Sequence, residues 1–240
     1  MYRKELTYYF TSPIAYIVIG LYLLLISLFL WIIPGEWNII DSGYAQTDGL
    51  FQLSPWLFLF LCPALTMRLF SEERQRGTWN VLLTKPVSLT KIVVAKFAAA
   101  WTLVLIALLP CITHIIAVYM IAEPYGNVDI AAFCGSFIGL MLISLAFVAI
   151  GTFCSSFSKN QIVCFIISVI GCAFFYYGFD LTSSLVSSAQ AANIVQSLGG
   201  HTHFSSLARG VIDLSDVAYF IVATVFFIVS TIFSVQYKND

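Results

Sequence analysis

The chain has 240 residues, of which 60% are hydrophobic and only 10% are charged; its net charge is -1 and its mean hydropathy is +0.93. Soluble domains carry about 25% charged residues, so this composition excludes an ordinary soluble protein. The near-neutral net charge also excludes a general electrostatic attraction to nucleic acid. We therefore expect a membrane protein whose surface is mostly covered by lipid.

The first twelve residues differ from the apolar run that follows. Apolar and aromatic side chains recur there at helical spacing, opposite three charged ones. This pattern predicts a short amphipathic helix over 1–12, lying in the cytoplasmic headgroup layer. An untethered basic tail is the alternative. The apolar side is formed by Tyr2, Leu6, Tyr9 and Phe10, and the charged side by Arg3, Lys4 and Glu5.

Six apolar runs are long enough to cross a bilayer, which takes about 20 residues of helix. They predict an all-α membrane protein, a single transmembrane domain over 1–240 with six transmembrane helices. Pro110 lies within the third run and predicts a kink there. The six runs are 13–33, 54–70, 92–120, 130–153, 161–179 and 217–237.

The basic residues orient these spans, because Lys and Arg are retained on the cytoplasmic side of a membrane. With the N-terminus inside, only Arg209 of the 11 basic residues falls on the outer side. We therefore predict that the N- and C-termini are cytoplasmic. The other basic residues are Arg3, Lys4, Arg68, Arg74, Arg76, Lys85, Lys91, Lys96, Lys159 and Lys238.

The cytoplasmic connection over 71–91 contains the signals of a short helix. Gly77 permits a sharp bend, Thr78 can cap a helix, and Pro86 prevents its continuation. The expected helix covers 78–84 and presents an exposed apolar edge made of Trp79, Leu82 and Leu83. Two turns of helix are unstable alone. The helix therefore either docks onto a partner or closes the cytoplasmic ends of the spans.

The outer connection over 181–215 is also unusual. Its first half, 181–198, has apolar faces and few charges, Gly199 and Gly200 interrupt it, and a second helical stretch over 204–212 follows. The pattern predicts two half-helices that enter the outer leaflet and return, which requires cover by protein or water. An exposed loop is the alternative.

Few residues point to chemistry. His114 is expected to be a hydrogen-bonded structural residue, and His201 and His203 are interpreted as solvated loop histidines without a third metal ligand. There is no nucleotide-binding P-loop sequence, and no nucleophile is paired with a base. We predict no catalytic, cofactor or metal site, and we expect the six cysteines to pack as small apolar side chains.

The segment Glu72-Glu73-Arg74-x-x-Gly77-Thr78-x-x-x-Leu82-Leu83-x-x-Pro86-Val87-Ser88 resembles the coupling-helix region of ABC-2 type ABC transporter permeases. The six spans, the N-terminal helix and the outer segment also fit, so the resemblance covers the whole chain. Several short stretches are more narrowly similar to the gliding-motility-associated GldF permease subunits of Bacteroidetes. Among them are Leu83-Thr-Lys-Pro86, Phe175-Tyr-Tyr-Gly-Phe179 and Arg209-Gly-Val-Ile-Asp213.

The resemblance implies a non-catalytic permease subunit whose ATP is bound by a separate, GldA-like cytoplasmic subunit. The partner would be coupled through Glu72, Glu73, Arg74, Arg76, Gly77, Thr78, Trp79, Leu82, Leu83 and Pro86. It also implies dimerisation, or pairing with a GldG-like companion subunit that has a periplasmic region. A multi-pass protein of a bacterial inner membrane, with an export or gliding-machinery function, is what the resemblance implies.

Other functions remain open at this point. An ATP-independent channel or secondary carrier would not need a coupling helix, and a membrane-embedded enzyme would need a buried cluster of ionisable groups, which the sequence lacks. Within the ABC-2 permeases, copper-site maturation and polysaccharide export are further alternatives.

Overall fold

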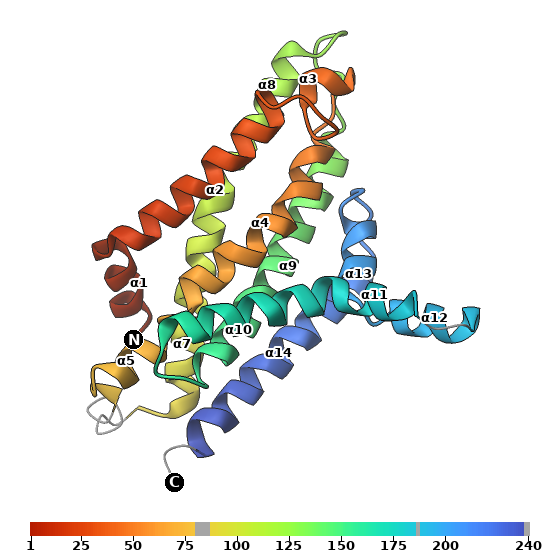
Figure 1. Cartoon of the computed structure of the whole chain (residues 1–240). Coiled ribbons are helices and arrows are strands. Elements are labelled where there is room, and N and C mark those ends of the chain that lie inside the picture. Colours follow the sequence, from red (N-terminus) through yellow and green to blue (C-terminus); the bar gives the residue numbers. More distant parts are fainter. Residues whose placement is uncertain (80–86, 186–187, 238–240) are drawn as a thin grey trace.

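The computed structural model describes residues 1–79, 87–185 and 188–237, and within these ranges it contains helices and no strand. The helices form an elongated bundle whose long members run between two ends (Figure 1). Their bounds are α1 Tyr2–Thr11, α2 Pro13–Trp31, α3 Ile39–Ser42, α4 Asp48–Thr66, α5 Ser71–Gln75, α7 Leu89–Leu108, η1 Leu109–Cys111, α8 Ile112–Ile121, α9 Ile130–Ser155, α10 Gln161–Ala173, η2 Phe174–Gly178, α11 Phe179–Ser183, α12 Ala189–Gln196, α13 Gly200–Leu207 and α14 Leu214–Tyr237.

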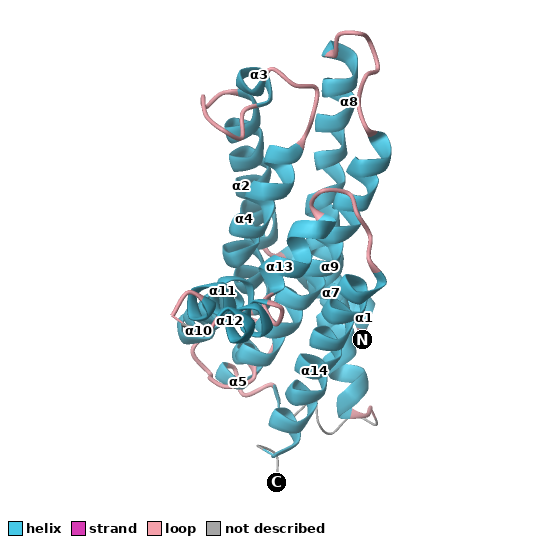
Figure 2. Ribbon diagram, turned by 90° about the vertical axis from the view of Figure 1, so that its right-hand side faces the viewer, coloured by secondary structure: helices cyan, strands magenta, loops and turns pink. Residues whose placement is uncertain are grey.

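Six helical segments in the described ranges are long and apolar enough to cross a membrane, as the sequence predicts. They are Pro13–Trp31, Asp48–Gln75, Leu89–Ile121, Ile130–Ser155, Gln161–Ser183 and Leu214–Tyr237. The third changes to a 3-10 turn at Pro110, where the kink is expected. The N-terminal helix α1 and the last turn of α14 lie near the same end of the bundle (Figures 1 and 2).

Local capping explains where several helices begin. The hydroxyl of Ser12 accepts a hydrogen bond from the Ile14 N–H at the start of α2, where Pro13 occupies the first helical position. The Asp129 carboxylate accepts from the Ala132 N–H at the start of α9. At the start of α10, Asn160 Oδ1 accepts a hydrogen bond from the Ile162 N–H at 2.9 Å.

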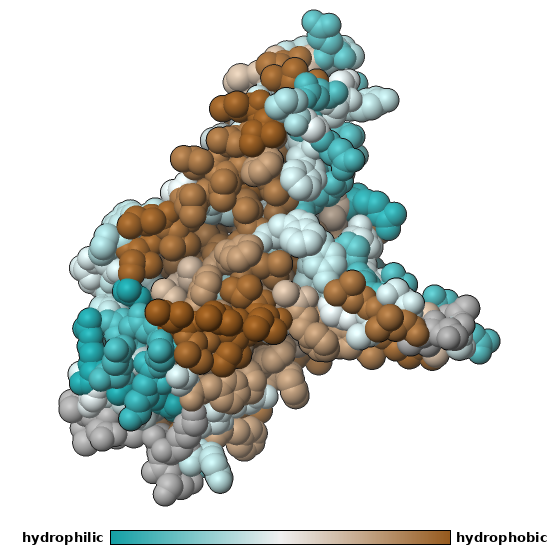
Figure 3. Space-filling view, viewed as in Figure 1, coloured by the Kyte–Doolittle hydropathy of each residue, from teal (hydrophilic) through white to brown (hydrophobic). Residues whose placement is uncertain are grey.

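Helix α9 lies at the centre of the bundle. It packs against α4, α10 and α14, and most of its length is buried. The span that contains α4 is also mostly buried, whereas the remaining four expose much of their apolar surface, which Figure 3 shows as brown side chains over α2 and α10. Teal side chains cover the end near α1 and α5. This distribution fits a bundle whose middle faces lipid and whose ends face water.

Between η2 and α14, the described residues form three short helices. Helices α11 and α12 extend away from the bundle, whereas α13 lies against α9 (Figure 1). Gly199 and Gly200 do separate two helices, but the second covers Gly200–Leu207, not the expected 204–212. The helix ends early because Gly210 takes a φ of +80° and packs against α9, where its Cβ would lie 2.5 Å from Ala132 Cα.

Candidate functional site

The best-defined polar site lies at the end of the bundle that carries α1 and α5, and its centre is Lys96. Only 3% of the Lys96 side chain is exposed, although the residue lies in the third turn of a mostly apolar helix. Its ammonium contacts Glu5 Oε2 of α1 at 3.2 Å and Glu73 Oε1 of α5 at 2.9 Å. One buried cation therefore joins three helices, α1, α5 and α7.

A second set of polar contacts joins α1 to α5. The Tyr8 hydroxyl donates a hydrogen bond to Glu72 Oε1, and Arg76 approaches the same oxygen at 2.7 Å. Burial, and then the hydrogen bond to Glu72, raise the pKa of Tyr8 above its ordinary value, so the phenol stays a proton donor. The neighbouring Tyr9 is buried and donates to Leu65 O of α4 at 2.7 Å.

Aromatic rings continue this network toward α9. The Lys96 ammonium lies 5.7 Å from the centre of the Phe70 ring, and Phe70 packs edge-on against Trp79, also at 5.7 Å. The Arg74 guanidinium lies 5.7 Å from the Trp79 ring centre and donates a hydrogen bond to Ser156 O, just beyond α9. Contacts at these distances are attractive cation–π interactions. The base of the 71–91 segment is thus attached to the bundle on two sides.

This packing corrects one expectation about the segment. Trp79 is not part of an exposed edge, because only 6% of it is exposed and its ring lies between Phe70 and Arg74. Gly77 has a φ of +71°, which is the sharp bend expected there. The predicted edge residues Leu82 and Leu83, and the predicted end at Pro86, lie outside the described residues.

A cavity of about 290 Å³ adjoins these residues. It is lined by Lys4, Glu5, Tyr8, Tyr9, Arg68, Leu69, Glu72, Glu73, Arg76, Thr78 and Lys96. Among the described residues, the Oε2 atoms of Glu72 and Glu73 are buried without a hydrogen-bond partner. Buried carboxylate oxygens require donors, so this cavity can accept donor groups from water or from a bound protein.

The structure therefore brings together part of the predicted coupling set. Glu72, Glu73, Arg74 and Arg76 lie in or beside one charged cluster, and Thr78 lines its cavity. The sequence did not identify Glu5, Tyr8, Phe70 and Lys96 as members. Lys96 could have revealed this cluster from the sequence, because a lysine inside an apolar run needs a partner when it is buried.

The histidines have structural partners. His114 is buried and accepts a hydrogen bond from Trp31 Nε1 at 2.9 Å, as expected of a structural histidine. His201 and His203 are not solvated loop residues: both lie in α13, each 2.7 Å from an aspartate, Asp180 and Asp216 respectively. Within the described ranges, no group of three or more His, Cys, Asp or Glu side chains could hold a metal ion.

Comparison with known families shows which family the sequence matches. A model described as ABC-2 family transporter protein matches residues 40–198, about two thirds of the chain. The matched region includes α4, the 71–91 segment and the spans up to α12. No curated protein matches the chain closely enough for comparison.

Proposed function

Because the chain belongs to the ABC-2 family of transporter membrane proteins, we propose that it is the permease subunit through which a separate ATP-binding protein moves the spans. The family and the six apolar helices make the chain a multi-pass permease subunit of an ABC transporter, and the family implies an ATP-binding partner. Our proposal concerns how this chain receives the movement.

The observation that carries the proposal is the Lys96 ammonium between Glu5 and Glu73. Glu73 stands at the base of the 71–91 segment, which follows α4 and precedes α7. A partner that pulls on this segment displaces α5, and the buried ion contacts transmit the displacement to α1 and α7 together. Breaking these contacts without replacement is costly, so the three helices move as one unit.

The proposed partner surface has two parts. Leu82 and Leu83 are the apolar contacts, and the cluster around Glu72 and Glu73 accepts donor groups of the ATP-binding subunit. The unpartnered Oε2 atoms of these two carboxylates support the second part. Arg76 stands beside them with 65% of its side chain exposed, so it is accessible to a partner. The permease itself would bind no ATP and would be non-catalytic.

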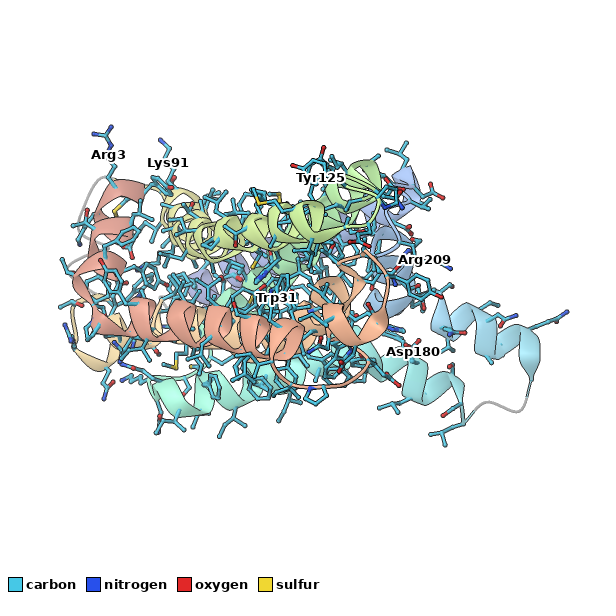
Figure 4. All side chains as sticks on the ribbon, turned by 90° about the horizontal axis from the view of Figure 1, so that it is seen from above. Arg3, Trp31, Lys91, Tyr125, Asp180 and Arg209 are labelled. Carbon is cyan, nitrogen blue, oxygen red and sulfur yellow. The ribbon has the colours of Figure 1, made fainter. Side chains whose placement is uncertain are left out.

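We place this end of the bundle in the cytoplasm of a bacterial cell, with the protein in the inner membrane. Ten of the 11 basic residues support this orientation, since Arg209 alone lies in the outer segments. Figure 4 shows the separation for labelled residues: Arg3 and Lys91 lie toward one end, and Arg209 lies toward the other. On this placement α1 is an interfacial helix, and α11 to α13 form the outer re-entrant segment.

The complex we propose is a gliding-associated one, with a GldA-like ATPase and a GldG-like companion or a second copy of this chain. The support is the short stretches similar to GldF permeases, such as Leu83-Thr-Lys-Pro86. Its role is either export or service to a surface machine of Bacteroidetes.

The test is a pull-down of the tagged permease from native membranes, with ATP hydrolysis measured in each eluate. We expect an ATP-binding subunit to co-purify with the wild type and to be lost in a Leu82→Asp, Leu83→Asp variant. The matched control is Tyr44→Asp, Tyr125→Asp, because these exposed residues follow α3 and α8, which lie at the opposite end of the bundle (Figure 1). The control should keep the partner.

Two outcomes would change the proposal. If the leucine variant keeps its ATPase as well as the control does, the 71–91 segment is not the contact. The identity of the companion tests the finer assignment, because a periplasmic partner of the GldG type supports gliding. A copper-maturation or polysaccharide-export partner would contradict it.

A further inference from the structure

A second cavity lies toward the end of the bundle opposite α1, between α4 and α13. Its volume is about 410 Å³, within the range of roughly 300–1,000 Å³ that small-molecule sites occupy. One wall is a face of α4, where Asp48, Gln52 and Trp56 recur every four residues and therefore share one side of the helix. Figure 3 shows pale and teal side chains where α4 faces α13, in contrast to the brown surface of α2.

The opposite wall has the same spacing. His201 and Ser205 lie on α13, and Arg209 follows one turn later, just after the helix ends. The position of this wall is fixed by α9, because Ser136 Oγ donates a hydrogen bond to Ala208 O at 2.9 Å. The two walls thus present a regular series of polar and aromatic groups to each other.

The two ends of this cavity differ in polarity. Asp48 begins α4, and Trp56 lies eight residues further along, about 12 Å deeper at 1.5 Å per residue. At the deep end the Trp56 ring packs 4.6 Å from Tyr177, which stacks on His201 at 5.2 Å. Asp180 contacts the His201 imidazole at 2.7 Å and orients it. The cavity therefore changes from a charged mouth to an aromatic interior.

The charged mouth contains both signs. Glu36 and Asp48 are two carboxylates, and Arg209 is a guanidinium; all three line this cavity and are exposed. None of the three forms an ion pair with another described residue. Two acids and one base that do not neutralise each other suit a ligand that brings its own cation and its own anion.

We propose that this cavity binds a zwitterionic group in which a phosphate ester carries an ammonium. The ammonium lies by the carboxylates of Glu36 and Asp48, since a carboxylate and an ammonium form a charge-assisted hydrogen bond. The phosphate lies on Arg209, whose forked donors fit phosphate oxygens. The group is the headgroup of an amphiphile or a free molecule. Phe174 and Leu181 are exposed and lie one helical turn before and after Tyr177 in the chain, so they offer apolar surface to an acyl chain.

The inference deepens the proposed function, because it names the kind of molecule that the permease would move. Binding itself needs no ATPase, however. It is measured on the purified full-length permease in an uncharged detergent, by calorimetric titration. The probes are short-chain phosphatidylethanolamine, which carries both charges, short-chain phosphatidylglycerol, which lacks the ammonium, and free phosphoethanolamine.

We expect the wild-type permease to bind phosphatidylethanolamine at least about tenfold more tightly than phosphatidylglycerol. The Asp48→Asn and Arg209→Gln variants should each bind phosphatidylethanolamine about tenfold more weakly than the wild type, since each loses a hydrogen bond to a charged group. Arg3→Gln, at the other end of the molecule (Figure 4), is the matched control and should bind as the wild type does. All three residues are exposed, so the variants should fold.

The outcomes are distinct. Equal binding of the two lipids, or binding by Asp48→Asn and Arg209→Gln at the wild-type level, would overturn the inference. Tight binding of free phosphoethanolamine supports the headgroup chemistry and assigns a soluble ligand, whereas binding of the lipid alone assigns an amphiphile. A permease that binds no zwitterion but co-purifies with its ATPase contradicts this inference and leaves the proposed function standing.

Discussion

Replacing Lys96 with methionine tests the charged cluster most directly, because methionine keeps the unbranched shape of the side chain, is one atom shorter, and carries no charge. In the folded protein the variant leaves Glu5 and Glu73 without their cation, while 9% of the Glu5 side chain and 21% of the Glu73 side chain are exposed. Removing one partner of a buried ion pair costs about 3–5 kcal/mol. Glu73 is the more accessible carboxylate and borders a cavity that can hold water, so we expect the lower end, about 3 kcal/mol.

Variants of Glu5 show how much each ion contact of Lys96 contributes to stability. Glu5→Gln should cost less, about 1 kcal/mol, because Lys96 keeps Glu73 and the glutamine remains a hydrogen-bonding group. The double variant Glu5→Gln, Lys96→Met should be more stable than the sum of the single changes predicts, by at least about 1 kcal/mol, because the unpaired Glu5 carboxylate is gone.

The assay is equilibrium unfolding of the purified permease in mixed micelles with increasing sodium dodecyl sulfate, followed by tryptophan fluorescence. Lys91→Met is the matched control: Lys91 lies on the same helix, is exposed, and should change stability by less than about 0.5 kcal/mol. A Lys96→Met variant within about 1 kcal/mol of this control would refute the argument that the cation holds three helices together.

Two further predictions concern the packing of the spans. Gly151→Ala should lower the stability of the fold by about 1–3 kcal/mol, because the added Cβ would lie 2.1 Å from Thr66 Oγ1 where α9 meets α4. The control Gly20→Ala should not destabilise the protein, because no atom lies within 4 Å of the added Cβ. Thermal denaturation in detergent compares the two variants. His114→Leu should lower the stability by about 1–3 kcal/mol, because the Trp31 indole N–H loses its hydrogen-bond acceptor. The same thermal denaturation assay measures this loss. A melting temperature equal to that of the wild type would show that the hydrogen bond adds nothing to stability.

The spans were predictable because a bilayer demands long apolar runs, and each run is visible without knowledge of its neighbours. The residues at which the spans begin and end were less predictable. The second span begins at Asp48 rather than Ser54, since the first turns of α4 contain polar residues that face the cavity beside α13. A search for apolar runs alone misses helical turns that contain polar residues.

The contents of the candidate site depended on contacts that are distant in the chain. Lys96 and Glu5 are separated by 91 positions, so the sequence could show an unusual lysine but not the carboxylate that pairs with it. The same limit explains Trp79. An apolar edge on a short helix predicts that something covers it, and here Phe70 and Arg74 of the same chain cover the tryptophan. The α13 histidines likewise acquire their aspartates only when α11 and α14 assemble around them.

The central position of α9 bears on how the protein is made. A helix that contacts α4, α10 and α14 has neighbours synthesised both before and after it. During synthesis α9 can pack on α4 at once, but the side that belongs to α14 stays open until the last span enters the membrane. The contact between the Ser156 and Ser234 hydroxyls, 2.9 Å apart, also forms only when α14 arrives. A nascent chain halted before α14 therefore leaves one face of the central helix without its neighbour, a feature by which membrane quality control can distinguish unfinished copies from complete ones.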